Sequence, residues 1–164
     1  MDIPVIGADM DFSPVVDRER CNCTTLRKAS RRLSQFYDAA LAPSGLKSTQ
    51  FAIFAQIDRR GGEPPTIREL ADALVMDQST LGQNLRPLER DGLISLEQAA
   101  TDRRRRHVKL TRKGRLRFAA AHPLWKSAQA LFETSFGEQD AAALRLALLK
   151  IADDRSLNAV GETP

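Results

Sequence analysis

The sequence predicts a mainly α-helical (α+β) domain that carries one β-hairpin. Apolar residues recur at steps of three and four along most of the chain, which is the period of a helix with one buried face. The period changes to two only around Ile94–Leu96 and Val108–Leu110, as in two paired strands. With 164 residues, of which 42% are hydrophobic, the chain can form one packed domain with a short appendage. We therefore expect helices before and after a single two-stranded sheet.

The N-terminal segment 1–20 shows no sustained period and contains two prolines and a glycine, so we expect a flexible arm there. It has no basic region before an apolar stretch, and no apolar run in the chain is long enough to span a bilayer. These features favour a cytoplasmic protein. A helical pattern then starts at Cys21 and continues to Leu41, where the sequence APSGL ends it.

The next segment predicts two helices separated by a firm break. Ser48 is expected to cap a helix that runs to about Arg60, and its apolar residues lie on more than one face, which indicates a central, buried helix. The sequence GGEPP then breaks the chain. Thr66 and Glu69 follow with the spacing of a capping box, which predicts the start of a short helix.

A further helix begins near Asp77 or Gln78 and ends at Asp91-Gly92. Two short helices joined by a tight turn, the second with polar and basic residues outward, are typical of a helix-turn-helix. Pro87 lacks an amide hydrogen and is expected to kink this second helix. The buried stripe consists of Leu81, Leu85 and Leu88, and the opposite side carries Ser79, Gln83, Arg86 and Arg90, with Thr80 and Asn84 beside them.

The hairpin that follows completes the pattern of a winged helix, in which the wing tip lies beside a DNA duplex. Four consecutive arginines at 103–106 occupy the tip and the start of the returning strand. Arginine suits that position because its charged fork pairs with phosphates and fits a narrow minor groove. Thr111 is then expected to cap a long helix with a kink before Pro123, and Gly137 separates it from a last helix.

Positive charge is concentrated in one section of the chain. Residues 78–117 contain eleven Lys or Arg and four acidic residues, a balance of +7, whereas the whole chain has a net charge of +4. The remainder is therefore acidic. A basic section on an acidic body predicts a surface for a polyanion, of which nucleic acid is the commonest.

Three stretches together resemble the multiple-antibiotic-resistance regulator (MarR) family of winged-helix transcription factors. They are LAPSGLKSTQFAIFAQI, TIRELADALVMDQSTLGQNLRPLERDGLI and DRRRRHVKLTRKG, in the order and spacing of the family, and the resemblance covers about residues 21–153. It implies a homodimeric repressor that binds pseudo-palindromic double-stranded DNA and is released by a small aromatic or phenolic effector. It also implies a helical dimerisation region at 21–47 and 112–153, a DNA-binding lobe at 48–111 and a C-terminal tail at 154–164.

The helix pattern and the resemblance together indicate the DNA-facing residues. Gln83 and Asn84 suit adenine edges, and Arg86 suits guanine or phosphate, although exposed helix residues can also contact only phosphate or solvent. In the wing, the resemblance implies that Asp102 orients Arg104. The full predicted set is Gln78, Ser79, Thr80, Gln83, Asn84, Arg86 and Arg90 in the helix and Asp102, Arg103, Arg104, Arg105 and Arg106 in the wing.

The sequence leaves the switch open between two kinds of site. Aromatic residues Phe36, Tyr37, Phe51 and Phe54, with Trp125 a weaker candidate, would line the ligand pocket that the resemblance implies, or else form plain core. The alternative is an oxidant sensor using Cys21 and Cys23. The family's peroxide sensors place a reactive cysteine near this helix start, but they surround it with tyrosines and this chain has only one.

The two cysteines also have a structural interpretation, in which the thiols of Cys21 and Cys23 pack as small hydrophobic groups. A bond between them within one helix is not expected, whereas a bond across a dimer satisfies disulfide geometry. A zinc site with His107 or His122 is a third alternative, but no compact Cys/His spacing supports it.

We expect no metal and no cofactor. Phosphate-binding loops, nucleophile elbows and zinc-hydrolase motifs are not found, so we expect no enzyme. A winged helix that binds protein or RNA is the other class to consider, and the polar, basic helix face favours DNA over it.

Overall fold

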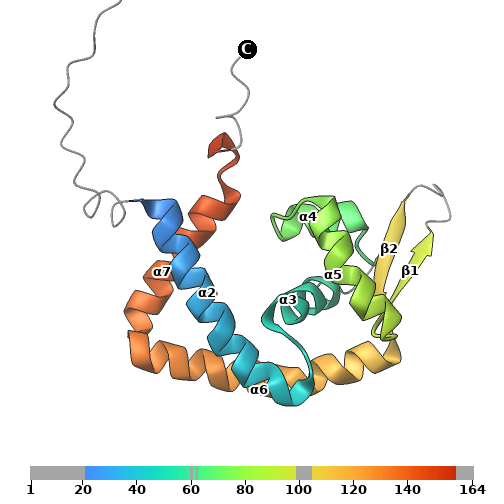
Figure 1. The fold of residues 1–164 in the computed structure, drawn as a ribbon, viewed down its shortest axis with the longest axis horizontal. Coiled ribbons are helices and arrows are strands. Elements are labelled where there is room, and N and C mark those ends of the chain that lie inside the picture. The colour runs from blue at the N-terminus through green and yellow to red at the C-terminus, as the bar shows by residue number, and fades with distance from the viewer. Residues whose placement is uncertain (1–20, 60, 62, 99–104, 158–164) are drawn as a thin grey trace, which may run out of the picture. The chain divides into compact units, whose positions relative to one another are not determined.

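The computed structural model describes residues 21–59, 61, 63–98 and 105–157. The chain divides into two compact units, residues 1–36 and 37–164, and each is described by itself. Figure 1 labels the elements. In chain order they are α2 (Asn22–Leu41), the short 3-10 helix η1 (Ala42–Ser44), α3 (Ser48–Asp58), α4 (Ile67–Ala73), α5 (Gln78–Arg90), β1 (Ile94–Gln98), β2 (Arg106–Leu110), α6 (Arg112–Phe136) and α7 (Glu138–Asp153).

The described part of the first unit is the N-terminal part of α2. Its side chains are exposed from residue 21 to 32, and only Leu33 and Phe36 are partly covered. The helix predicted between Cys21 and Leu41 is thus confirmed.

The core of the second unit is built around α3. Phe51, Ile53, Phe54 and Ile57 are all buried, so the prediction of a central helix with apolar residues on more than one face is confirmed. Residues from or next to α4, α5, β1 and β2 pack against them, as Figure 1 shows for α4, α5 and the sheet around α3. These are Leu70, Ala71, Leu81, Leu85, Leu88, Leu93, Ile94, Val108 and Leu110.

Two predicted helix caps are confirmed and one is wrong. The hydroxyl of Thr66 accepts from the amide of Glu69, and the Glu69 carboxylate accepts from the amide of Thr66 at 2.8 Å. Thr111 caps α6 by accepting from the amide of Gly114 at 3.0 Å. Ser48, however, is the first residue inside α3 rather than its cap. Its amide donates to the carboxylate of Asp38 at 2.6 Å, so a side chain ten residues earlier satisfies this helix end.

The predicted hairpin is present as an antiparallel pair in which Ile94 faces Leu110 and Leu96 faces Val108. The chain between α3 and α4 adds a third line of contact on the other edge of β2. Thr66 forms an isolated antiparallel bridge with His107, and the amide of Val108 donates to the Pro65 carbonyl at 2.8 Å. The returning strand of the wing is therefore held on both edges.

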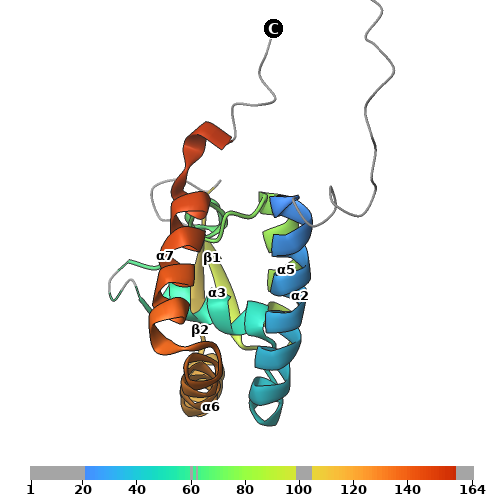
Figure 2. The same cartoon turned by 90° about the vertical axis from the view of Figure 1, so that its left-hand side faces the viewer.

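The long helices continue through their prolines. Pro87 lies inside α5 and Pro123 inside α6, and both helices are continuous at those residues. The kinks expected at these prolines stay predictions. Gly137 separates α6 from α7 with φ at 97°, a conformation that favours glycine. Figure 2 views α6 nearly end-on and shows α7 rising from its end. Within the described residues, no helix combines the length and apolar character needed to cross a membrane.

Candidate nucleic-acid interface

The N-terminus of α5 is organised by the side chain of Asp77. Its carboxylate accepts the amide of Thr80 at 2.7 Å and the hydroxyls of Ser79 and Thr80, both at 2.6 Å. These hydrogen bonds, led by the one from the Ser79 hydroxyl, hold the pKa of Asp77 well below its ordinary value. The negative charge therefore persists at neutral pH and fixes the first turn of the helix.

The two faces of α5 separate as the sequence predicts. Leu81, Leu85 and Leu88 are buried, which confirms the apolar stripe. Asn84 is half-buried and donates to the Thr80 carbonyl at 2.9 Å. The other predicted DNA-facing side chains of this helix are exposed: Gln78, Ser79, Thr80, Gln83, Arg86 and Arg90.

The wing arginines are only partly described. Arg105 and Arg106, at the start of β2, are exposed. Asp102, Arg103 and Arg104 lie outside the described residues. The implied pairing of Asp102 with Arg104 therefore stays a prediction.

Several cations of the basic section already bind partners within the chain. Arg90 pairs with Asp91 at 3.1 Å, and Lys109 pairs with Glu97. Lys113 donates to the Asp91 carbonyl at 2.8 Å, and Arg115 to the Leu110 carbonyl at 2.7 Å. By contrast, Arg86, Arg105 and Arg106 have no hydrogen bond or ion pair to any residue that the structure describes. Their guanidinium groups are available to an external anion.

A groove between α4, the start of α5 and the start of β2 brings in a residue that the sequence did not indicate. Its cavity volume is about 620 Å³, and Arg68 lines it together with Gln78, Arg105 and Arg106. Arg68 is exposed and lies within the capping-box motif, where sequence patterns assign roles only to Thr66 and Glu69. Arg68 shares this groove with Arg105 and Arg106, and only the fold brings these residues together.

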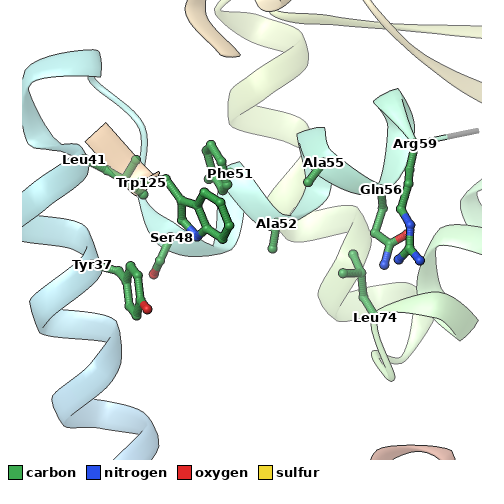
Figure 3. A pocket seen from close by; sticks show the side chains of 10 residues that line it. All are labelled: Tyr37, Leu41, Ser48, Phe51, Ala52, Ala55, Gln56, Arg59, Leu74 and Trp125. Carbon is green, nitrogen blue, oxygen red and sulfur yellow. The ribbon is translucent and has the colours of Figure 1, made fainter. Parts of the chain in front are cut away.

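A second cavity, of about 360 Å³, lies along α3 and is drawn in Figure 3. Trp125 from α6 stacks on Phe51 with ring centroids 5.7 Å apart, and Tyr37 lies beside them. Gln56, Arg59 and Leu74 gather at the other end. The Tyr37 hydroxyl donates to Gln129 at 2.6 Å, and partial burial raises the pKa of this phenol. The cavity thus joins an aromatic end to a polar, cationic one.

The predicted aromatic set divides between cavity and core. Tyr37 and Phe51 line the cavity, and so does Trp125, which the sequence indicated less strongly. Phe54 is fully buried in the core and is not among the lining residues, because it lies on another face of α3. Phe36 is not among them either.

The two cysteines lie at the start of α2: Cys21 directly precedes it and Cys23 is its second residue. Both side chains are exposed in the described chain, and the packing interpretation stays a prediction for the dimer. The Thr24 hydroxyl donates to the Cys21 sulfur at 3.3 Å. His107, one of the two histidines considered for zinc, has its Nδ1 atom 2.6 Å from the Pro64 carbonyl oxygen.

A helix-turn-helix followed by a two-stranded wing, with free arginines beside an exposed polar helix face, defines a winged-helix DNA-binding regulator. The chain belongs to the MarR family, whose model matches residues 44–105. The structure of the Mycobacterium tuberculosis transcriptional regulator MosR in complex with DNA is 38% identical with a TM-score of 0.73, covering 81% of this chain and 94% of that one.

Three further structures share the fold. The transcriptional repressor CouR bound to a 23-mer DNA duplex is 25% identical, with a TM-score of 0.73 and coverage of 83% of this chain and 95% of that one. A mutant of Escherichia coli MarR complexed with operator DNA is 21% identical, with a TM-score of 0.70 and coverage of 85% and 96%, and shares the fold. CouR from Rhodococcus jostii RHA1 has also been crystallised with p-coumaroyl-CoA, at 18% identity and a TM-score of 0.69. MosR is described as a transcriptional regulator and CouR as a transcriptional repressor.

Proposed function

We propose that the protein is a homodimeric repressor that binds a pseudo-palindromic operator and releases it when a small aromatic molecule binds. The observation that carries this proposal is the exposed polar face of α5 next to Arg105 and Arg106, which have no partner among the described residues and lie where β2 begins. In this assignment α5 is the recognition helix, and Gln83, Asn84 and Arg86 read base edges in the major groove. The wing arginines contact the minor groove or its phosphates.

Dimerisation would use the helices outside the DNA-binding lobe. Large apolar side chains are at least half exposed on the second half of α6 and on α7, which is costly unless another surface covers them. They are Leu131, Leu146, Leu149 and Ile151, with Phe136 close to half exposed. We assign residues 21–47 and 112–153 to this dimerisation region and 48–111 to the DNA-binding lobe. Two recognition helices about 34 Å apart would then read half-sites one helical turn apart.

The cavity along α3 is our candidate effector site. Its stacked Phe51 and Trp125 suit a planar aromatic group, and Tyr37 and Arg59 offer polar contacts. The p-coumaroyl group bound by CouR is aromatic and phenolic, which agrees with that chemistry. An effector here would contact α3 and α6 together, and so could favour a geometry of the lobe that does not fit the operator.

Exposure of both cysteines supports a second candidate, an oxidant-sensing repressor. One hydrogen peroxide would take two electrons and two protons from two thiols, giving one disulfide and two waters. We assign the bond to two subunits of a dimer, because Cys21 and Cys23 of one chain point in different directions.

The test is a fluorescence-anisotropy titration of the gene's own upstream duplex, with light scattering to give the mass of the complex. The proposal expects a dimer on one duplex, and binding at least tenfold weaker for a Gln83→Ala, Arg86→Ala variant. Equal binding by this variant would overturn the assignment of α5. Peroxide sensitivity that a Cys21→Ser, Cys23→Ser variant lacks would favour the oxidant sensor over the ligand-released repressor.

A further inference from the structure

We infer that the groove between α4 and β2 is a binding site for a phosphodiester of the DNA backbone, and that Arg68 is its principal phosphate contact. This inference rests on DNA binding through α5 and the wing. It adds a third DNA contact between these two. The helix that carries Arg68, α4, belongs to neither the recognition helix nor the wing.

The backbone pairing of the wing creates this site. Thr66 bridges to His107, so the residue two positions after Thr66 comes close to the two residues before His107. Those residues are Arg68 on α4, Arg105 directly before β2 and Arg106, the first residue of β2. All three line one groove of about 620 Å³. Gln78, the first residue of the recognition helix, lines it as well. The groove therefore lies between the two elements that are assigned to the major and minor grooves.

The strand that separates a major groove from the adjacent minor groove is a phosphate backbone. A protein that inserts α5 into one and its wing into the other must lie against that backbone between them. In this protein the surface at that point is the groove with Arg68. Phosphate contacts of this kind fix the register of a protein on the duplex without reading the sequence.

The guanidinium of Arg68 is free to make the contact. Among the described residues it has no hydrogen bond or ion pair, although two carboxylates lie in the same groove. Glu69 accepts both the amide and the hydroxyl of Thr66 at 2.8 Å as part of the helix cap. Asp72 is exposed and is not within ion-pair distance of Arg68.

Charge alone does not explain the site. Arg68, Arg105 and Arg106 against Glu69 and Asp72 leave a balance of +1 among these side chains. Because this net charge is small, the proposed contact depends mainly on directed hydrogen bonds. The arginine fork supplies them, since it binds a phosphate through two parallel N–H donors. We therefore expect Arg68→Lys to keep the ionic part of the contact and lose part of the affinity.

The experiment measures the affinity of the dimer for two duplexes, the upstream region and a 30-base-pair duplex of random sequence, across a series of salt concentrations. Arg68→Ala should weaken binding to both duplexes by a similar factor, about tenfold at moderate salt, because two charge-assisted contacts are lost per dimer. The slope of log K against log salt should become less steep by about two, and Arg68→Lys should restore the slope but not the full affinity. Arg155→Ala, an exposed cation beyond the end of α7 and outside both assigned regions, is the matched control and should leave both measurements unchanged.

Equal affinity and slope for Arg68→Ala and wild type would overturn this inference while leaving the proposed function intact. Weaker binding to the upstream duplex alone, with an unchanged slope, would also overturn it, since Arg68 would then read sequence. If wild type showed no salt-dependent binding to either duplex, the proposed function would fail together with this site. Thermal unfolding of each variant verifies that the fold is retained.

Discussion

The Nδ1 atom of His107 lies 2.6 Å from the carbonyl oxygen of Pro64. A carbonyl can only accept, so Nδ1 carries the proton and donates. This contact continues the line formed by the Thr66–His107 bridge and the Val108–Pro65 hydrogen bond. It fastens the returning strand of the wing to the loop before α4, directly beside Arg105 and Arg106. The His107 side chain thus helps to hold the segment that carries Arg105 and Arg106, together with the pairing of β1 and β2.

Replacing His107 should damage the wing more than the fold. His107→Ala removes one hydrogen bond of a largely covered ring, so we expect the free energy of unfolding to fall by about 1–2 kcal/mol. DNA affinity should fall several-fold at a temperature where the variant remains folded. His107→Gln, which retains a donor, should recover part of both. His122→Ala, an exposed histidine on α6, is the control; if it matched His107→Ala in DNA binding, the wing assignment would be wrong.

Gly114 is required by a close approach between α6 and the start of the hairpin. A Cβ atom at this residue would lie 2.0 Å from the carbonyl oxygen of Leu93, which also accepts the amide of Thr111 at 3.1 Å. We expect Gly114→Ala to cost about 2–3 kcal/mol of unfolding free energy, measured by urea denaturation. Gly82 in α5 has nothing within 4 Å of such a Cβ, so Gly82→Ala should gain about 0.5–1 kcal/mol. Similar effects for the two variants would contradict this explanation.

Local sequence signals predicted most of this fold because the interactions concerned are local. The caps at Thr66 and Thr111 and the stripe of Leu81, Leu85 and Leu88 each depend on residues within a few positions of one another. The error at Ser48 has the opposite cause. The carboxylate of Asp38, from the preceding helix, satisfies the start of α3, and no pattern inside the α3 segment signals it.

The candidate site was predictable only where a single element carries it. The exposed face of α5 follows from helical spacing, whereas Arg68 gains its neighbours Arg105 and Arg106 through a strand-like contact too short to leave a period in the sequence. Trp125 reaches the cavity because α6 packs on α3, which spacing alone does not reveal. The exposure of Cys21 and Cys23 was not predictable either, because helix periodicity does not say whether another surface covers a helix end.

The cap of the recognition helix predicts a specific pH dependence. Hydrogen bonds lower the pKa of Asp77 from its ordinary value of 3.8, so its contribution to stability is fully present above that value and is lost as the pH falls towards the folded-state pKa. Asp77→Ala should therefore lower the thermal unfolding midpoint by a constant amount from pH 7 to pH 5. The difference from wild type should shrink as the pH falls below 3.8. A difference that stayed constant at the lowest pH would show that the carboxylate charge is not involved.

The single tryptophan of the chain makes the proposed effector site directly observable. Trp125 lines the cavity and stacks on Phe51, so an aromatic compound that enters should quench or shift its fluorescence. We expect saturable quenching by members of a panel of phenolic carboxylic acids, and the same compounds should release DNA in an anisotropy competition. Ala55→Leu places a larger side chain into the cavity and should abolish both effects while DNA binding without effector persists.

Ala119→Leu provides the matched control for that experiment, because Ala119 is exposed on α6 and is not among the cavity-lining residues. It should respond to the same compounds as wild type. Compounds that released DNA without changing Trp125 emission, or that acted equally on Ala55→Leu, would locate the effector site elsewhere. The two readouts are independent, since one reports on the cavity and the other on α5 and the wing. Their agreement across the panel would link occupancy of the cavity to loss of the DNA complex.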